Sequence, residues 1–408
     1  MPKPVRLLYF TAETWPTFRA DVAVLFGKDL PQHGVYADLV TARTEGTAPK
    51  EWGGGRAHLL DCSGGRIKRH FTRALHAWRE LRRIDLSRYD AIQVRDMPLP
   101  AFLALRRARR AQVPFFYWMS YPMPEGQIAR AAETGLSAGL TRFLFPWIRG
   151  RFGRYLLYRR VLPYADHVFV QSERMKADLI ERGVSADRMT PVPMGVDLAA
   201  LQLDEIEPAD DPRLLDRKVL VYLGTLNRPR RIEILFDMLA LVREVEPSAV
   251  LVLVGDTDDD VHRNNLRQRA QAAGVAEHVV WTGWLPMRVG WRYVRSADVG
   301  LSPFPRGYLL DSASPTKVPE YLALGVPVVC NDNPDQQQLV EQCNCGRCVP
   351  YTASDFACAV LELLQLPDAE RAAMSARGFQ MISAIRDYRT LAASLAKHYR
   401  HLTGSRAA

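Results

Sequence analysis

The segment DSASPTKVPEYLALGVPVV, residues 311–329, contains groups that could bind a phosphate. Ser314 is a favoured helix N-cap residue, and Pro315 suits the first position of a helix. A helix that starts here leaves the backbone N–H groups of Thr316 and Lys317 at the positive end of its dipole, where an anion is stabilised. An alternative stays open, because the same four residues also make an ordinary, well-capped helix start.

A carboxylate follows one turn later on the same helix. Glu320 lies where it could accept hydrogen bonds from the hydroxyl groups of a ribose. The helix is expected to run to Leu324 and to stop at Gly325, since glycine is the residue that most often ends a helix. Phosphate-binding and hydroxyl-binding groups would then share one short helix.

The elements that position these groups alternate between strand and helix. In the first half, helices are expected at 18–32 and 98–111, and Ser172 is expected to cap another. The expected strands are VRLLYFT, YADLVT, YDAIQV, PFFYWM and HVFVQS. Such alternation is typical of a parallel sheet covered by helices on both faces.

The alternation restarts after an acidic, proline-containing stretch. The strands KVLVYLGTL, AVLVLVGD, VVWTG, DVGLSP and VPVVC alternate with helices, the first of them at 232–246. A chain of 408 residues exceeds one ordinary core. The sequence therefore predicts an α/β fold with two doubly wound parallel-sheet domains, facing a cleft at the carboxyl ends of their strands. The expected division is a first domain at 1–203, a linker at 204–216, a second domain at 217–380 and a C-terminal helical segment at 381–408 that crosses back toward the first domain.

The C-terminal segment contains an expected amphipathic helix, ISAIRDYRTLAASLAKHYRHL. Its apolar face is formed by Ile382, Ile385, Tyr388, Leu391, Leu395 and Tyr399.

Composition and charge narrow the function classes. Apolar residues make up 48% of the chain and charged residues 24%, as in an ordinary globular protein. No apolar run is long enough to span a bilayer or to form a signal core, so a cytoplasmic location is expected. Residues 1–165 carry 27 Lys and Arg against 13 Asp and Glu, whereas residues 166–408 carry 27 against 32. This asymmetry favours a basic domain that faces a polyanion or an acidic membrane.

The cysteines are expected to be free thiols, as is usual for a cytoplasmic chain of this length. The run CNCGRC offers three possible metal ligands, Cys343, Cys345 and Cys348, without a fourth nearby. We favour a loop of small residues here, and a zinc knuckle remains the alternative.

The order of the segments resembles that of the family 4 glycosyltransferases, which have the GT-B fold. The matching segments are YADHVFVQSERMKADLIERGVSADRMTPVPMGVD, VYLGTLNRPRR, LVLVGD, VVWTGWLP, ADVGLSPFP and SPTKVPEYLALGVPVV. The resemblance implies two Rossmann-like domains with a nucleotide-sugar site in the second. It also implies a polysaccharide-type glycosyltransferase that moves a hexosyl group from a UDP- or GDP-linked donor to a glycan or lipid-linked acceptor. Transfer would proceed with retention and would require no metal or other cofactor.

The resemblance assigns donor contacts to the second half. The family's diphosphate-binding basic pair corresponds to Thr225, a departure, and to Arg230 or Arg231, with Arg228 able to compensate. Arginine suits this role because it binds phosphate bidentately. Further diphosphate contacts fall on Ser314, Thr316 and Lys317, and nucleobase or ribose contacts fall on Gly255, Trp284, Leu285 and Glu320.

The catalytic assignment follows the family's paired glutamates, E-x7-E. Glu320 matches the second glutamate, but Ser312 stands in place of the first. We expect Asp311 or the hydroxyl of Ser312 to contact the donor sugar instead.

The first half matches the family less well. The histidine that follows the fourth strand in many relatives is absent from FYWMSYPMPEG, where Ser120 and Glu125 are the candidates for acceptor contacts. The glycine-rich first loop is replaced by WPTFRADVAVL. There Arg19 could bind an acceptor phosphate, and Asp21 is either a polar acceptor contact or only a charge at a helix N-terminus.

Other function classes stay open. The missing first glutamate, histidine and glycine loop favour a non-catalytic GT-B-fold partner subunit of a polysaccharide assembly system. A sugar-nucleotide epimerase shares the architecture, but the sequence shows no cluster of carboxylates and histidines for acid–base chemistry.

One basic stretch, TRFLFPWIRGRFGRYLLYRR at 141–160, contains six arginines, six aromatic residues and no acid. Basic and aromatic residues interleave in nucleic-acid sites, but no binding module surrounds this stretch. Aromatic residues beside arginines are also typical of segments that bind anionic membranes. We therefore expect no nucleic-acid partner, and we expect peripheral association with the inner face of the cell membrane.

The same stretch is expected to form a helix with two sides. The apolar side, which would pack on the sheet, has Leu144, Ile148, Phe152, Tyr155 and Leu162, and the basic side has Arg142, Arg149 and Arg160.

Overall fold

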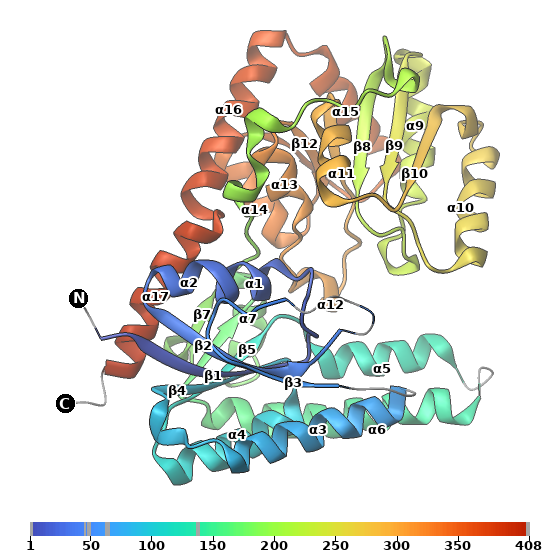
Figure 1. Ribbon diagram of the computed structural model, residues 1–408. Helices are drawn as coiled ribbons and strands as arrows, with labels where there is room; N and C mark the ends of the chain where they lie inside the picture. The colour runs from blue at the N-terminus through green and yellow to red at the C-terminus, as the bar shows by residue number, and fades with distance from the viewer. Residues whose placement is uncertain (1–2, 45, 47–49, 62–65, 136–138, 405–408) are drawn as a thin grey trace. The chain divides into compact units, whose positions relative to one another are not determined.

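The computed structural model describes residues 3–44, 46, 50–61, 66–135 and 139–404. The chain forms two compact units (Figure 1). Unit 1 comprises residues 1–193 and 388–408, and unit 2 comprises residues 194–387. Cys62, which is expected to be a free thiol, lies outside the described residues.

Unit 1 is built on a seven-stranded sheet in the order β3-β2-β1-β4-β5-β6-β7, with parallel pairing throughout. The strands are β1 (Val5–Thr11), β2 (Val35–Ala42), β3 (Ala57–Leu60), β4 (Ala91–Arg95), β5 (Phe115–Met119), β6 (His167–Val170) and β7 (Met189–Pro191). The α-helices are α1 (Ala20–Ala23), α2 (Leu30–Gln32), α3 (Arg66–Arg83), α4 (Pro98–Ala111), α5 (Met123–Thr134), α6 (Leu140–Leu156), α7 (Glu173–Ile180) and α17 (Tyr388–Gly404). The strand order reverses at β1, as in doubly wound sheets.

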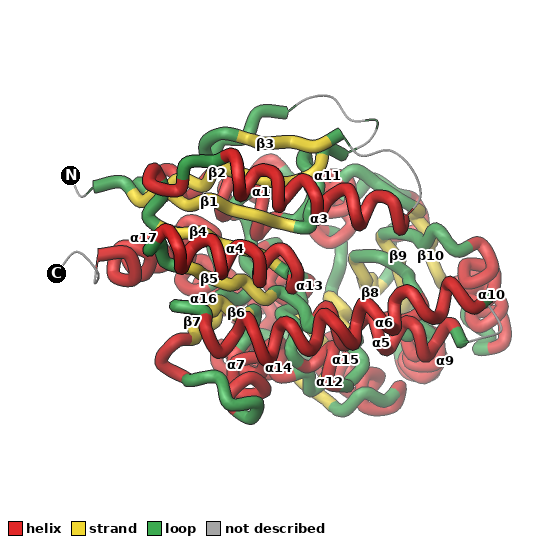
Figure 2. Tube along the Cα trace, turned by 90° about the horizontal axis from the view of Figure 1, so that it is seen from below, coloured by secondary structure: helices red, strands yellow, loops and turns green. Residues whose placement is uncertain are grey.

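Helices cover both faces of this sheet. On one face α3, α4 and α6 pack side by side (Figures 1 and 2). On the other face α17 packs against β1, α2 and the π-helix η1 (Leu25–Asp29). Tyr388 and Tyr399 of α17 are fully buried there, beside Tyr9 and Phe26. The C-terminal helix is therefore part of the core of unit 1.

Unit 2 is built on a six-stranded parallel sheet in the order β10-β9-β8-β11-β12-β13. The strands are β8 (Lys218–Leu223), β9 (Ala249–Val254), β10 (Val279–Gly283), β11 (Val299–Ser302), β12 (Val328–Asn331) and β13 (Gly346–Val349). The α-helices are α8 (Leu198–Leu201), α9 (Ile234–Val245), α10 (Asp260–Ala272), α11 (Met287–Arg295), α12 (Tyr308–Asp311), α13 (Lys317–Ala323), α14 (Pro334–Cys343), α15 (Ala353–Gln365) and α16 (Asp368–Ile385). The predicted pair of doubly wound parallel sheets is confirmed.

The boundaries between the units differ from the expected division. Residues 204–216 belong to unit 2 and form the 3-10 helices η7 (Leu203–Glu205) and η8 (Pro212–Leu214). Ile206 is buried in the core of unit 2, and Arg288 of α11 donates a hydrogen bond to Glu205. The stretch lacks apolar periodicity because its few apolar side chains anchor an irregular segment rather than one face of a helix.

The expected C-terminal helix is divided by a break at residues 386–387. Arg386 is buried, and its guanidinium donates hydrogen bonds to Asp335 Oδ1 at 2.9 Å and to the carbonyl of Met194 at 3.2 Å. The carbonyl of Arg386 in turn accepts a bond from Val196 at 2.8 Å. These bonds hold residue 386 within unit 2, so α16 ends before it and α17 begins in unit 1.

Among the other helices predicted for unit 1, two features are confirmed and one helix differs from the prediction. Ser172 caps α7 as predicted, since its hydroxyl accepts a hydrogen bond from the backbone of Met175 at 3.0 Å. Helix α4 spans the predicted 98–111. The helix expected at 18–32 is instead divided into α1, η1 and α2.

The apolar side predicted for residues 141–160 is confirmed only for Leu162, which is buried in the core of unit 1. Ile148, Phe152 and Tyr155 are about half exposed. Helix α6 packs instead through glycine: a Cβ on Gly150 would lie 2.8 Å from the carbonyl oxygen of Pro124 in α5. Glycine allows this close approach of two helix backbones, and the aromatic side chains are left on the outer surface.

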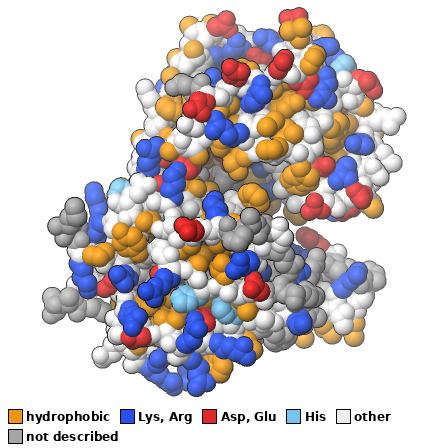
Figure 3. All heavy atoms as spheres, viewed as in Figure 1, with side chains coloured by type: hydrophobic (Ala, Val, Ile, Leu, Met, Phe, Trp, Pro, Cys, Tyr) orange, Lys and Arg blue, Asp and Glu red, His pale blue; other side chains and the backbone are white. Residues whose placement is uncertain are grey.

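The basic character of unit 1 is concentrated on its helices. The α3 sequence RIKRHFTRALHAWRELRR and the α4 sequence PLPAFLALRRARRA carry many of the cations. On the face shown in Figure 3, Lys and Arg side chains gather over the part of unit 1 where these helices lie. No helix among the described residues has both the length and the apolar content needed to cross a bilayer.

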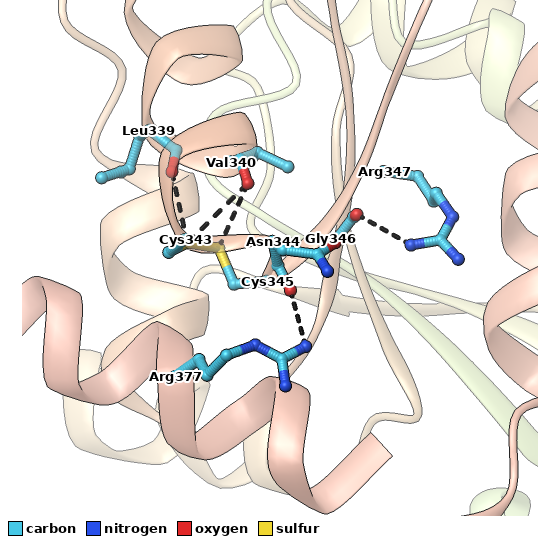
Figure 4. The surroundings of a disulfide bond; sticks show 8 residues. All are labelled: Leu339, Val340, Cys343, Asn344, Cys345, Gly346, Arg347 and Arg377. Atoms are coloured by element: carbon cyan, nitrogen blue, oxygen red, sulfur yellow. Dashed lines mark hydrogen bonds between the residues drawn. A yellow bond between two sulfur atoms is a disulfide. The ribbon is translucent and has the colours of Figure 1, made fainter. Parts of the chain in front are cut away.

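The cysteine run of unit 2 is not entirely reduced, contrary to expectation. Cys343 and Cys345 form a disulfide at the end of α14 (Figure 4). Cys330 and Cys348 are free and lie opposite each other in the β12–β13 pair. Two of the three candidate zinc ligands are therefore bonded to each other.

Candidate active site

The carboxyl ends of β8 and β9 come very close together in unit 2. Gly224 follows β8 and Gly255 follows β9, and a Cβ on Gly255 would lie 2.2 Å from the carbonyl oxygen of Gly224. Both glycines have positive φ values, 140° and 134°, which other residues rarely adopt. This edge of the sheet therefore exposes backbone rather than side chains.

Lys317 points at this edge from the start of α13. Its side chain is buried, and a Cβ on Gly224 would lie 3.2 Å from Lys317 Nζ. The ammonium lies 5.0 Å from the ring centroid of Tyr222. Within the described part of the chain, no hydrogen bond or ion pair satisfies it. A buried cation without a carboxylate partner is costly, which is the arrangement expected where an anionic ligand binds.

The pKa values of the two charged groups on α13 converge. Burial, together with the positive charge of Arg230, lowers the pKa of Lys317 to about 7, against the effect of Glu320. Burial raises the pKa of Glu320 to about 7, against the effects of Lys317 and of a hydrogen bond with Thr316. Lys317 and Glu320 therefore lie on one helix, as predicted, and influence each other through their charges without forming an ion pair.

The three candidate arginines differ in how they are held. Arg230 lies over the ring of Phe304 at 4.8 Å, half-buried, and its charge reaches Lys317. Arg228 is exposed and pairs with Asp259 at 3.0 Å. Arg231 is exposed and in the left-handed region, with φ 47°. Of the three, Arg230 is the one that adds to the positive potential around Lys317.

Ser314 is not the N-cap of α13, contrary to prediction. Thr316 occupies that position, and no side-chain cap bond is present. The hydroxyl of Ser314 donates to Asp335 Oδ2 at 2.8 Å and accepts from the backbone of Met194 at 3.0 Å. The buried Asp335–Arg386 pair binds this hydroxyl, so it is not available to cap the helix. The prediction of a Ser314 cap was wrong for this reason.

The two residues assigned to the donor sugar are engaged locally. Asp311 accepts hydrogen bonds from Arg306 Nε at 2.9 Å and Nη2 at 3.2 Å. Ser312 is buried, and its hydroxyl donates to the carbonyl of Tyr308 at 2.7 Å. A sugar contact by either group would require these bonds to be exchanged.

The two residues assigned to the nucleobase differ in exposure. Trp284, which follows β10, is 55% exposed, whereas Leu285 is half-buried against the core of unit 2. The acidic turn after Gly255 is also ordered, because Asp256 accepts a hydrogen bond from Arg263 at 2.8 Å.

A separate ionic cluster lies at the carboxyl end of β4 in unit 1. Arg95 is buried and donates to Asp21 Oδ2 at 2.7 Å and to Ser120 Oγ at 3.0 Å. Arg19 donates two further bonds to Asp21, both at 3.2 Å. Asp96 accepts from the backbone of Ser120 at 2.9 Å and from its hydroxyl. The predicted residues Arg19, Asp21 and Ser120 are thus brought together around Arg95.

Electrostatics explains why this cluster is stable. Burial alone would raise the pKa of Asp21, but Arg95 and Arg19 hold it below its usual value. Burial raises the pKa of Asp96, and Arg95 and Ser120 offset this only in part. Sequence reasoning missed Arg95 and Asp96, although two adjacent charges at the end of the apolar strand AIQVRD were a usable signal.

Glu125 does not join this cluster. Its Oε1 accepts a hydrogen bond from Arg182 Nη1 at 3.2 Å, and Arg182 lies over the ring of Tyr158. The carboxylate therefore fixes α5 to the segment after α7.

Comparison with known proteins agrees with this architecture. Residues 22–195 match the family model described as glycosyl transferase 4-like domain, and residues 217–366 match the model described as glycosyl transferases group 1. The chain belongs to the family 4 glycosyltransferases of the GT-B fold.

The sequence identity to individual relatives is low. Over 245 residues the chain is 26% identical to alpha-monoglucosyldiacylglycerol synthase of Streptococcus pneumoniae, covering 57% of this chain and 52% of that protein. Over 286 residues it is 27% identical to phosphatidyl-myo-inositol mannosyltransferase of Mycobacterium leprae, covering 67% of each. The chain thus spans about half to two thirds of the length of these relatives. The structure of sucrose-phosphate synthase from Thermosynechococcus elongatus superposes with a TM-score of 0.72 at 18% identity, covering 98% of this chain and 100% of that one, which shows a shared fold.

We expect Arg95→Met to lower the free energy of unfolding of unit 1 by about 3–5 kcal/mol, because it removes the buried guanidinium that offsets the charges of the buried carboxylates Asp21 and Asp96. Urea denaturation measures the loss. Arg107→Met, at an exposed position of α4, is the matched control and should change stability by no more than about 0.5 kcal/mol. Equal stability of the two variants would contradict the structural role given to Arg95.

Proposed function

We propose that the protein transfers a hexosyl group from a nucleotide diphosphate-sugar to a lipid-linked acceptor in glycolipid or polysaccharide synthesis. One observation carries the donor half of this proposal: Lys317 holds an unpaired ammonium in a buried position beside the exposed backbone of Gly224. A diphosphate supplies the missing negative charge, and Arg230 adds a second cation. We expect Glu320, on the same helix, to accept hydrogen bonds from the ribose.

The acceptor half rests on the relatives and on α6. The names of the two relatives refer to a monoglucosyldiacylglycerol and to a phosphatidyl-myo-inositol, both of them lipids. Helix α6 exposes Trp147, Ile148 and Phe152 among arginines, and Arg151 lies over the ring of Trp147 at 5.6 Å. Interfacial helices combine aromatic and cationic side chains in this way. Peripheral attachment to an anionic membrane would bring a lipid acceptor within reach.

The mechanism proposed for transfer uses the protein's own cations and no metal ion. The leaving diphosphate gains negative charge in the transition state, and Lys317 and Arg230 would stabilise that charge. Retention would follow if the acceptor attacks from the face that the diphosphate leaves. Asp311 and Ser312 remain the candidates for contact with the donor sugar.

A second candidate function is a non-catalytic partner that binds the nucleotide. The observation that favours it is the engagement of Asp311 by Arg306 and the burial of Ser312, at the place where the family has its first glutamate. Absence of both sugar transfer and donor hydrolysis, with nucleotide binding retained, would support this function instead.

We expect Lys317→Met to weaken UDP and GDP binding by about 10- to 100-fold, the range for loss of one charge-assisted bond. Isothermal titration calorimetry measures the affinities, and Arg267→Met, at an exposed site on α10, is the control. Glu320→Gln should weaken binding of the nucleotide but not of inorganic pyrophosphate, which has no ribose. Unchanged nucleotide affinity in Lys317→Met would rule out this donor site.

The pH dependence of binding provides a separate prediction. A bound diphosphate favours protonated Lys317, so it raises the pKa of this group above the value of about 7 in the free protein. Binding then takes up a proton, and the UDP association constant should fall as pH rises from about 7.5 to 9.5. The phosphate of UDP has completed its own titration in this range, since its pKa is about 6. The Lys317→Arg variant should show a flatter profile; an equal slope would contradict the assignment.

We expect the protein to sediment with vesicles of anionic phospholipid at low ionic strength and to be released by salt. Replacing Arg151 and Arg154 together by Gln should weaken this binding by about 30-fold, since each charge contributes about 1 kcal/mol. A double Gln variant of Arg217 and Arg267, which are exposed in unit 2, is the control. Failure of the unaltered protein to sediment would remove the membrane part of the proposal.

A further inference from the structure

A cavity of about 130 Å³ lies in unit 1, among α3, α4, α5 and α6. Its walls include Arg73 of α3, Arg149 of α6 and Asp96 at the end of β4. The remaining lining is largely apolar, with Leu99, Met123 and Phe152 among the residues that form it. The cavity therefore combines cations with a hydrocarbon surface.

The two arginines of this cavity form no ion pair with its one lining carboxylate, that of Asp96. Arg73 donates one hydrogen bond to the carbonyl of Ala12 at 3.2 Å, but its Nε is buried without a partner among the described residues. Arg149 is half-buried and, in the same described set, forms no ion pair or hydrogen bond. Asp96 is already bonded to Ser120 and lies 3.6 Å from Arg95. The two lining arginines are therefore available to bind an anion.

Electrostatic repulsion between the arginines supports the same conclusion. Burial lowers the pKa of Arg149, and the charges of Arg130 and Arg73 lower it further. The positive potential is therefore strong at Arg149, and it is not relieved from within the protein.

We propose that this cavity binds the phosphate of a lipid and the first carbons of its chain. This inference rests on the proposed function, because it assigns that lipid as the acceptor. The volume is close to the ~150 Å³ of an apolar cavity that binds benzene, which is enough for a phosphate and a few methylene groups but not for a sugar nucleotide. Arg73 and Arg149 bind the phosphate oxygens, and the apolar walls exclude water from them.

The position of Phe152 indicates how the lipid enters. This residue lines the cavity and is also 51% exposed on α6, among the aromatic residues assigned to the membrane surface. A lipid chain that leaves the cavity past Phe152 therefore reaches that surface directly. Free phosphate would use the arginines alone and would gain nothing from the apolar walls.

Monomeric octyl phosphate is the probe that tests this site, by calorimetry below its micelle concentration. We expect it to bind at least 10-fold more tightly than inorganic phosphate and than octyl glucoside, which carries the same chain without the charge. Arg149→Met should weaken the binding of octyl phosphate at least 10-fold, and Arg149→Lys should retain most of the affinity. Phe152→Ala should weaken the binding of octyl phosphate and leave the affinity for inorganic phosphate unchanged.

The matched control is Arg107→Met, at an exposed position of α4 outside the cavity. Equal octyl phosphate affinity in the Arg149→Met and Arg107→Met variants would overturn the proposal. Inorganic phosphate binding as tightly as octyl phosphate would also overturn it, because the ligand would then not be a lipid.

Transfer assays separate this inference from the proposed function. With a membrane lipid extract as acceptor, Arg149→Met should raise the KM for lipid and leave UDP affinity unchanged. An unaltered KM would overturn the acceptor assignment while the transferase activity stands. Octyl phosphate binding that behaves as expected in a protein that neither binds UDP nor transfers sugar would support the lipid site and contradict the proposed function alone.

Discussion

The absence of a side chain at Gly224 determines what unit 2 can bind. Any Cβ there would lie about as close to the Lys317 ammonium as a hydrogen-bonding partner does, at 3.2 Å. The glycine leaves space in front of the ammonium, and its neighbour Gly255 allows the next loop to approach until no side chain fits between them. Burial of Lys317 would then serve binding rather than only cost stability, if the space it faces holds the anion proposed above. The shift of its pKa toward neutrality is a consequence of this same geometry.

The parts of the fold that depend on local patterning could be predicted from the sequence. Apolar strands alternate with helices, and this pattern alone fixes two doubly wound sheets. The placement of Lys317 and Glu320 on one helix also follows from spacing. Ser314 could not be predicted in the same way, because its hydroxyl is bound by Asp335, 21 residues away in the sequence. A capping preference of about 1 kcal/mol does not outweigh a buried charged network.

Helix α6 shows a second reason why a helical repeat in the sequence cannot predict which side chains are buried. A helical repeat identifies which side chains share a face, but it does not say which face is buried. In α6 the glycine face is buried, since Gly150 and Gly153 let the helix lie close to Pro124 of α5. The apolar residues that would normally mark the inner face are therefore outside. Small residues at a helix contact were the signal that could have reversed the prediction.

The candidate site in unit 2 uses a lysine, whereas the cavity in unit 1 uses arginines. This difference affects how readily each site could release a bound anion. Lys317 is a buried amine whose pKa is about 7, so its charge depends on the presence of an anion. Arginine does not lose its proton at any physiological pH, so Arg73 and Arg149 stay charged whether or not a ligand is bound. A leaving group that must depart after each turnover is better matched by a cation whose charge can be given up. A lipid phosphate that must stay bound in the cavity is better matched by permanent charges. On this argument the chemistry of the cations, and not only their positions, fits a donor site in unit 2 and a lipid site in unit 1.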